Sequence, residues 1–371
     1  MTLDEAEAQE SFLDAVGVVG PALLTALDAL EKASRRLHPP AIRALRQVLG
    51  PVGDRLEEAI ETLEATPAPA ELHDLRVQLG EAAAHAAEAV RQFSSSAGPE
   101  RGVAQILGAM RSHCRAQESL FPLRKALPPV NRFFLEAAVQ DRVDTLDPDP
   151  APDPEARVGI FHARNDLEER GGFSLYVPES FDPAEPLPLV VALHGGSGHG
   201  RDFLWTWLRE ARSRRCLLLA PTARGATWSL EGADVDAANL RAMVEYVAES
   251  WAVDRERVLL TGLSDGATYA LLCGLQPDMP FTALAPLSGV LHPANFANGN
   301  LERARGRRIY LVHGALDWMF PVAIARMADE ELRKAGAEVT YREIEDLSHT
   351  YAREENARIL EWLDPGLALG R

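Results

Sequence analysis

The chain has 371 residues, of which 46% are hydrophobic, so it is long enough for two domains and apolar enough for a sizeable core. Its formal net charge is -17 and its pI is about 5.1, which makes nucleic acids and anionic membranes unfavourable partners. No run of about 18 apolar residues is present, and we therefore expect no membrane span.

The first part of the chain is rich in Ala, Leu and Glu, with apolar residues at helical spacing. Proline-containing stretches such as Pro39-Pro40 and Pro128-Pro129 punctuate it. The predicted helices cover residues 3–37, 42–63 with an interruption at Gly50-Pro51, 71–93, 103–127 and 131–146. This pattern predicts an all-α domain over residues 1–146.

A change of composition follows the helices. From Asp147 to Pro154, Asp and Pro alternate, which disfavours both helix and strand. We therefore predict a linker over residues 147–155 and a second domain over residues 156–371.

The second domain alternates short apolar runs with helical segments. We expect strands at residues 158–163, 173–177, 189–193, 216–220, 258–261, 283–287, 309–312 and 339–344. We expect helices near residues 236–250, 264–275, 322–335 and 351–363. The first two strands suggest a hairpin, and the later alternation predicts a mostly parallel sheet with helices on both faces. Ligand-binding loops then gather at the carboxyl ends of the strands.

A serine stands between two glycines in Gly262-Leu263-Ser264-Asp265-Gly266. A predicted strand precedes this stretch and a predicted helix follows it, which is the context of a nucleophile elbow. Such a turn exposes the serine hydroxyl at the helix N-terminus, and the glycines avoid collisions with neighbouring backbone. The pattern predicts that Ser264 is a nucleophile.

A serine hydroxyl needs a base and an acid that orients the base. Asp317 follows the predicted strand 309–312, and His349 follows the predicted strand 339–344. Both residues therefore fall at the sheet edge where an elbow serine is presented. The chain order predicts that His349 is the base and that Asp317 orients it.

His313 and Asp346 are the alternatives for these two roles. His313 ends its strand before the aspartate loop, so we expect local packing or hydrogen bonding there. Asp346 lies three residues before His349 and could share its turn. Asp317 remains the better orienting acid.

The apolar strand at 189–193 runs into a glycine-rich loop, His194 to Gly200. Backbone N–H groups can turn inward in such a loop, and we predict that the N–H of Gly196 joins the N–H of Asp265 in an oxyanion hole. The spacing is not G-x-G-x-x-G and no G-K-[ST] is present, so phosphate binding is not expected. His194 is expected to support the loop by hydrogen bonding.

From about Ala156 to Arg371 the chain resembles the α/β-hydrolase superfamily, near esterases of the phospholipase/carboxylesterase and polyhydroxybutyrate-depolymerase-like types. The matching pieces are His194-Gly195-Gly196, Val253 to Val258 leading to the elbow, His313 to Asp317, and Ser348-His349. The resemblance implies an α/β-hydrolase fold with a mostly parallel central sheet, here preceded by an all-α domain. It implies carboxylic ester hydrolysis through an acyl-enzyme, with no cofactor. Separately, we expect no metal site.

Asp265 departs from this resemblance, because many such enzymes carry Gln, Ala, Met or Asn after the serine. A carboxylate there could raise the pKa of the imidazole or disfavour anionic acyl groups. The backbone donor is unaffected, so we interpret the residue as tuning the site.

Aromatic residues give the substrate clues. Trp228 and Trp318 fall just beyond strand ends, and we predict that they line an apolar acyl or aryl pocket. Phe203, Trp205 and Trp207 follow the glycine-rich loop, where ordinary packing is at least as good an explanation. Short-chain or aryl esters are therefore the expected substrates.

Two rival functions stay open. The same residues would cleave thioesters, acylated peptides or polyester oligomers, which the triad cannot discriminate. Outside catalysis, the fold could serve as a binding module that acts through the helical domain. That domain could also cover the active-site mouth, form a homodimer or bind a partner, or merely pack against the sheet.

The cysteines and the start of the chain bear on location. Cys114, Cys216 and Cys273 cannot all pair and have no metal-ligand spacing. The acidic first residues lack the basic and apolar regions of a secretory signal. We therefore expect a cytoplasmic protein.

Overall fold

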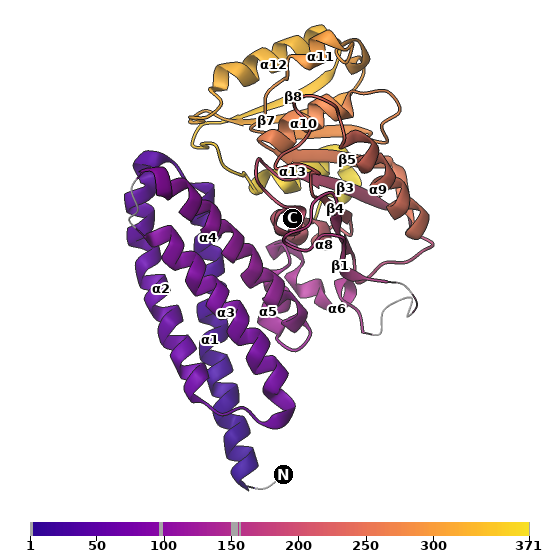
Figure 1. Cartoon of the computed structure of the whole chain (residues 1–371). Helices are drawn as coiled ribbons and strands as arrows, with labels where there is room; N and C mark the ends of the chain where they lie inside the picture. Colours follow the sequence, from indigo (N-terminus) through magenta and orange to yellow (C-terminus); the bar gives the residue numbers. More distant parts are fainter. Residues whose placement is uncertain (1–2, 96–98, 150–154, 156, 371) are drawn as a thin grey trace. The chain divides into compact units, whose positions relative to one another are not determined.

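The computed structural model describes residues 3–95, 99–149, 155 and 157–370 (Figure 1). The chain divides into two compact units, Met1–Phe134 and Leu135–Arg371. Residues 150–154 of the predicted linker lie outside the described residues.

The N-terminal unit is built from long helices. Helix α1 packs against α2 and α3, and α3 packs against α4. Buried side chains at their contacts include Leu30, Leu49, Val90 and Phe93. The elements are α1 (Leu3–Arg35), α2 (Ile42–Ala65), α3 (His73–Ser94), α4 (Pro99–Leu120) and α5 (Pro128–Phe133), with 3-10 turns at Pro39–Ala41, Ala70–Leu72 and Phe121–Arg124.

Helix α2 differs from its prediction, because it continues through Gly50 and Pro51 without interruption. Proline removes one backbone hydrogen bond, but the exposed Pro51 leaves the buried face of the helix intact. A side chain at Gly53 would place its Cβ 2.8 Å from Cγ1 of Val90, so α2 and α3 approach closely here. Tertiary packing outweighs the local helix-breaking signal.

Helix α1 qualifies the expectation that no segment spans a membrane. Residues Ala6–Arg35 are long and apolar enough to cross one, by length and composition alone. Phe12, Leu23 and Leu27 on the same helix are fully buried within the unit. A core helix of a bundle passes the same test, so this property does not identify a membrane segment.

The predicted helix 131–146 is broken into α5, a 3-10 helix at Ala137–Arg142 and α6 (Val143–Leu146). Residues from Leu135 onward group with the second unit, so the boundary falls earlier than the predicted residue 146. Asp147, assigned to the linker, forms a 2.9 Å ion pair with Arg212, and neither side chain is exposed. A buried guanidinium requires such partners, and the sequence pattern does not reveal them.

The C-terminal unit contains an eight-stranded sheet in the order β1-β2-β4-β3-β5-β6-β7-β8. The first two strands are antiparallel, as predicted, and the pairs from β4 onward along this order are parallel. The strands are β1 (Gly159–Ala163), β2 (Phe173–Val177), β3 (Leu187–Leu193), β4 (Leu217–Pro221), β5 (Val253–Leu263), β6 (Ala283–Leu287), β7 (Arg308–Gly314) and β8 (Glu338–Ile344).

The central strands are buried on both faces, so helices cover both sides of the sheet, as predicted. The helices of this unit are α6, α7 (Gly200–Phe203), α8 (Leu208–Ser213), α9 (Ala237–Ser250), α10 (Asp265–Gly274), α11 (Ala294–Ala297), α12 (Val322–Lys334) and α13 (Glu354–Leu363), with 3-10 turns at Leu204–Thr206, Glu302–Ala304 and Pro365–Leu367.

Strand β3 lies between β4 and β5, so the strand order reverses beside it. In an open parallel sheet, ligands bind outside the carboxyl ends of the strands at such a switch point. Leu193 at the end of β3 pairs with Gly262 at the end of β5. The glycine-rich loop and the serine turn therefore begin side by side.

Candidate active site

Ser264 occupies a strained turn between β5 and α10. Its φ of 56° and ψ of -116° lie in a region that residues other than glycine rarely adopt. A Cβ on Gly262 would lie 2.6 Å from the carbonyl carbon of Gly266, and a Cβ on Gly266 would lie 2.5 Å from the carbonyl oxygen of His194. Glycine is therefore required on both sides of the serine.

The structure brings together the three residues predicted to form the triad. The Nε2 atom of His349 is 2.9 Å from Oγ of Ser264, and its Nδ1 atom is 2.8 Å from Oδ2 of Asp317. An ionised carboxylate only accepts hydrogen bonds, so Nδ1 carries the proton and Nε2 is free to accept one from the serine.

The loop after β7 holds Asp317 in place. Its Oδ1 atom accepts hydrogen bonds from the backbone N–H groups of Met319, at 2.9 Å, and Phe320, at 2.8 Å. Burial by itself raises the pKa of Asp317, but the hydrogen bonds from His349 and Phe320 outweigh it, and the pKa lies below its usual value. The carboxyl group is thus ionised at neutral pH.

Neither alternative residue takes the role of His349 or Asp317, although Nε2 of His313 lies 3.4 Å from Oδ2 of Asp317. His313 is fully buried, and its Nε2 atom donates to the carbonyl oxygen of Phe320 at 2.8 Å, which supports the loop that carries Asp317. Asp346 is exposed, and the partner of Nδ1 of His349 is Asp317.

The glycine-rich loop after β3 leaves the backbone N–H of Gly196 without an acceptor among the described residues. The carbonyl oxygen of Gly195 accepts hydrogen bonds from Nδ1 of His194, at 2.7 Å, and from the N–H of Gly198, at 3.0 Å. The N–H of Gly196 belongs to the same planar peptide and points the opposite way. Neither this N–H nor that of Asp265 donates to any residue within the described ranges.

His194 is held as a neutral imidazole. The backbone N–H of Ala223 donates to its Nε2 atom at 3.1 Å, so the proton resides on Nδ1 and points at the Gly195 carbonyl. Burial lowers the pKa of His194 to about 3. His194 therefore supports the loop by hydrogen bonding, as predicted, and it does so as an uncharged donor.

The side chain of Asp265 turns toward the same loop. Its Oδ2 atom accepts a 2.6 Å hydrogen bond from Oγ1 of Thr227 on the loop after β4. A Cβ on Gly196 would lie 2.7 Å from this carboxylate oxygen. Glycine at 196 and aspartate at 265 are thus matched in space.

The two tryptophans predicted to line a pocket behave differently. Trp318 is 55% exposed, beside the exposed Leu316 and Met319. Trp228 is 3% exposed, stacks on Tyr269 with ring centroids 5.5 Å apart, and donates from Nε1 to the carbonyl oxygen of His194. The indole of Trp228 is therefore packed inside the protein, where it supports the glycine-rich loop instead of lining a pocket.

Phe203, Trp205 and Trp207 are also buried, which agrees with packing.

Sequence reasoning missed Thr227, and it missed the contact of Phe320 with His349. The ring of Phe320 meets the imidazole of His349 edge-on, with centroids 5.2 Å apart. Thr227 is far from Asp265 along the chain, so no local signal reveals their hydrogen bond. Phe320 directly follows Trp318-Met319, and its place near the acid was the one available clue.

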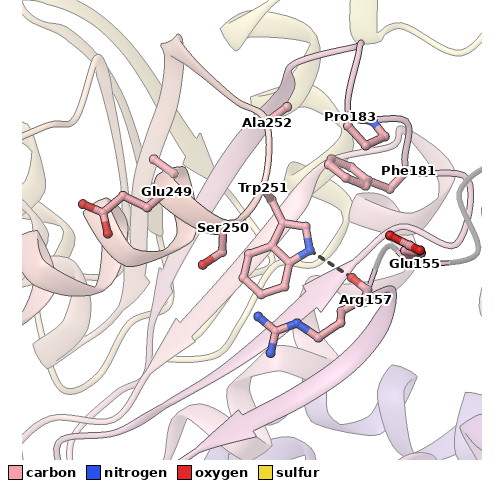
Figure 2. Close-up of a pocket in the computed structure, with 9 residues that line it drawn as sticks. Glu155, Arg157, Phe181, Pro183, Glu249, Ser250, Trp251 and Ala252 are labelled. Carbon is pink, nitrogen blue, oxygen red and sulfur yellow. Dashed lines mark hydrogen bonds between the residues drawn. The ribbon is translucent and has the colours of Figure 1, made fainter.

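An open cavity of about 490 Å³ lies at the opposite end of β5 from Ser264 (Figure 2). Phe181, Pro183 and Trp251 line it, and Nε1 of Trp251 donates to the carbonyl oxygen of Arg157 at 2.9 Å. None of the residues that line it belongs to the candidate active site. Within the described residues, no group of three or more His, Cys, Asp or Glu side chains is arranged to hold a metal.

Residues 231–365 match the family model described as phospholipase/carboxylesterase. The C-terminal unit has an α/β-hydrolase-like fold, with a mostly parallel eight-stranded sheet and helices on both faces. The matched segment contains Ser264, Asp317 and His349, and it begins at residue 231, after the glycine-rich loop.

Feruloyl esterase C of Emericella nidulans is 30% identical to the chain over 128 residues, which cover 32% of this chain and 46% of that protein. The chain therefore spans about half the length of this curated relative. Among solved structures, a thermostable esterase is 22% identical, with 55% of this chain and 61% of that chain covered and a TM-score of 0.45. Fluorophosphonate-binding serine hydrolase F of Staphylococcus aureus is 14% identical, with 55% and 96% covered and a TM-score of 0.45.

Proposed function

We propose that the hydrolase unit cleaves carboxylic esters through an acyl-enzyme on Ser264. The observation that carries this proposal is the imidazole of His349, whose two nitrogens lie within hydrogen-bonding distance of Ser264 and Asp317. A serine, a neutral imidazole and a buried carboxylate in this order are the components that activate a hydroxyl for attack on a carbonyl.

In the proposed reaction, Nε2 of His349 takes the proton of Ser264 as its Oγ attacks the ester carbonyl. Asp317 holds the imidazole in the required tautomer and stabilises its charged form. The protonated imidazole then gives the proton to the departing alcohol, and the acyl group stays on Oγ. Water repeats the sequence with the same base, releases the acid and restores the serine.

The negative charge that forms on the carbonyl oxygen needs donors that are already in position. The N–H groups of Gly196 and Asp265 have no acceptor among the described residues, and they are the donors we propose for the oxyanion. A donor of this kind contributes about 2.7–4 kcal/mol to lowering the barrier.

For the substrate, we propose short-chain or aryl esters. Leu316, Trp318 and Met319 expose apolar surface on the loop that carries Asp317, so an apolar acyl or aryl group would find contacts next to the reacting carbonyl. The curated relative is a feruloyl esterase by name, which makes an aryl ester one of the substrates to test first.

The proposal is tested with p-nitrophenyl acetate and butyrate and with a fluorophosphonate probe. We expect the wild-type protein to hydrolyse the esters and to be labelled at Ser264. The Ser264→Ala variant should fold normally by circular dichroism and lose both properties. Hydrolysis that persists unchanged in Ser264→Ala would refute the assignment. Labelling on a different residue would do the same.

We also propose that the protein resides in the reducing cytoplasm, because the two buried cysteines, Cys216 and Cys273, are thiols outside any disulfide. Burial raises the pKa of the Cys216 thiol to about 12, so it stays protonated and unreactive. Cell fractionation tests this location, and recovery of the chain outside the cytoplasmic fraction would contradict it.

A further inference from the structure

Arg170 precedes β2 and reaches two loops of the active-site edge. Its Nη1 atom donates to the carbonyl oxygen of Gly198 at 2.7 Å, on the loop after β3. Its Nε atom donates to Ala223 at 3.0 Å, and its Nη2 atom donates to Gly225 at 2.6 Å and to Ala226 at 3.4 Å, all on the loop after β4. The side chain of Arg170 therefore forms hydrogen bonds to both loops.

All four acceptors of Arg170 are backbone carbonyls of the loops after β3 and β4. Burial lowers the pKa of the guanidinium, and the nearby Asp236 opposes that shift. A guanidinium offers five N–H donors in a rigid fork, which suits several carbonyls at once. A lysine ammonium has three donors on a single atom and cannot reach all these positions.

The hydrogen bond to Gly198 leads directly to the proposed oxyanion hole. The N–H of Gly198 donates to the carbonyl oxygen of Gly195, and this carbonyl shares its peptide plane with the N–H of Gly196. The orientation of the Gly196 donor thus depends on where Gly198 is held. Arg170 binds the carbonyl oxygen of Gly198, while the N–H of Gly198 binds Gly195.

A second connection runs through the loop after β4. The N–H of Ser197 donates to the carbonyl oxygen of Ala226 at 3.1 Å, and Nη2 of Arg170 donates to the same oxygen. The next residue, Thr227, holds the carboxylate of Asp265. Gly196 is thus next to Ser197, and Asp265 is bound by Thr227. Both proposed oxyanion donors therefore lie beside residues whose loops are held by Arg170.

We infer that Arg170 is a positioning residue for ester hydrolysis, which sets the direction of the Gly196 N–H by fastening the loop after β3 to the loop after β4. The inference rests on the proposed function of Ser264. Arg170 itself does not touch the reacting atoms. Its removal should weaken binding of the oxyanion much more than binding of the uncharged ester.

The test compares Arg170→Ala and Arg170→Lys with Arg241→Ala, a matched control in which an exposed arginine donates to the single carbonyl of Pro277. We expect Arg170→Ala to lower kcat on p-nitrophenyl butyrate by about 10- to 100-fold with KM changed less than about twofold, somewhat below the loss of an entire oxyanion donor. Arg170→Lys should fall between this variant and the wild type. Arg241→Ala should match the wild type.

A trifluoromethyl ketone gives a readout that a general loss of folding would not mimic, because its adduct with serine carries an oxyanion. Its affinity should fall by about the same factor as kcat in Arg170→Ala. Guanidinium at millimolar concentration should restore part of the kcat of Arg170→Ala and leave Arg241→Ala unchanged. Arg170→Lys, which keeps the positive charge, supplies the same comparison if Arg170→Ala is poorly folded.

Three results separate the possible failures. A folded Arg170→Ala variant with kcat within about twofold of the wild type would overturn the role of Arg170 alone. Loss of kcat with unchanged ketone affinity and no rescue by guanidinium would also overturn it, and would leave a purely structural role. Wild-type protein that neither hydrolyses esters nor reacts with fluorophosphonate would overturn the proposed function, and the role of Arg170 with it.

Discussion

The candidate active site has two sides that share firm hydrogen bonding but differ in the surface they expose. On the side of β3 and β4, the loops are rich in glycine, and their carbonyls are bound by His194 and Arg170. On the side of β7 and β8, the carboxylate of Asp317 is equally well held, but the same loop exposes Trp318 and Met319 to solvent. The comparison teaches that one side is built to position backbone donors and the other also offers apolar surface. We expect changes on the first side to act on kcat and exposed residues on the second to act on KM.

Replacing Asp317 with Asn is expected to have the largest effect. The amide would present a donor to Nδ1 of His349, which favours the wrong imidazole tautomer, and kcat should fall about 10⁴-fold. Steady-state kinetics on p-nitrophenyl butyrate measure this loss. Asp346→Asn is the matched control, because Asp346 is exposed near the same histidine. Equal losses in the two variants would contradict the assignment of the acid.

Gly196→Ala should lower kcat by about 10²- to 10³-fold, because the new Cβ would push against Oδ2 of Asp265 and tilt an oxyanion donor. The double variant Gly196→Ala/Asp265→Ala removes Oδ2 of Asp265, the atom with which the new Cβ collides. It should recover part of the lost kcat, which a double-mutant cycle quantifies. Additive losses would show that the collision is not the cause.

His194 predicts a pH dependence of stability. The unfolded chain binds a proton at this residue below about pH 6.5, whereas burial lowers its folded pKa to about 3. The stabilising contribution of the neutral ring is therefore complete above pH 6.5 and is lost as the pH falls toward 3. Between pH 7 and pH 4.5, the midpoint of urea unfolding should decrease more in the wild type than in His194→Asn. The same drop in both proteins would remove His194 as the source.

Trp318→Ala is expected to have the smallest effect, a rise in KM of about two- to tenfold for aryl or butyrate esters with kcat nearly unchanged, since it removes apolar contact area. Met327→Ala on α12 is a control of similar exposure. An unchanged KM in Trp318→Ala, across esters of different acyl size, would exclude Trp318 from substrate binding.

The sequence predicted the parts of the site that local pattern specifies. Strand alternation, the glycines around Ser264 and the chain order of Asp317 and His349 were enough to bring these three residues to one sheet edge. What it missed depends on partners distant in the chain. The ion pair of Asp147 with Arg212, the hydrogen bond of Thr227 with Asp265 and the burial of Trp228 arise only when loops from several strands meet.

In the helical region, local sequence signals predicted breaks and continuity that the structure does not have. Gly50 and Pro51 are strong local breakers, yet α2 passes through them because its buried face packs on neighbouring helices. The segment after α5 has a helical pattern, yet it breaks and joins the second unit, where Glu136 binds Arg214. Local propensity was overruled by tertiary contacts in both places.

Beyond the strand ends, main-chain hydrogen bonds continue from strand to strand across the active-site edge. The N–H of Ser264 donates to Leu287, that of Ser288 donates to Val312, and that of Ala315 donates to Ile344. These three hydrogen bonds join the backbone segments that carry Ser264, Asp317 and His349. They involve main-chain atoms alone, so they do not depend on the identity of a side chain. Substitutions in the surrounding loops can therefore reshape the surface beside Ser264 while the backbone keeps the spacing of Ser264, Asp317 and His349.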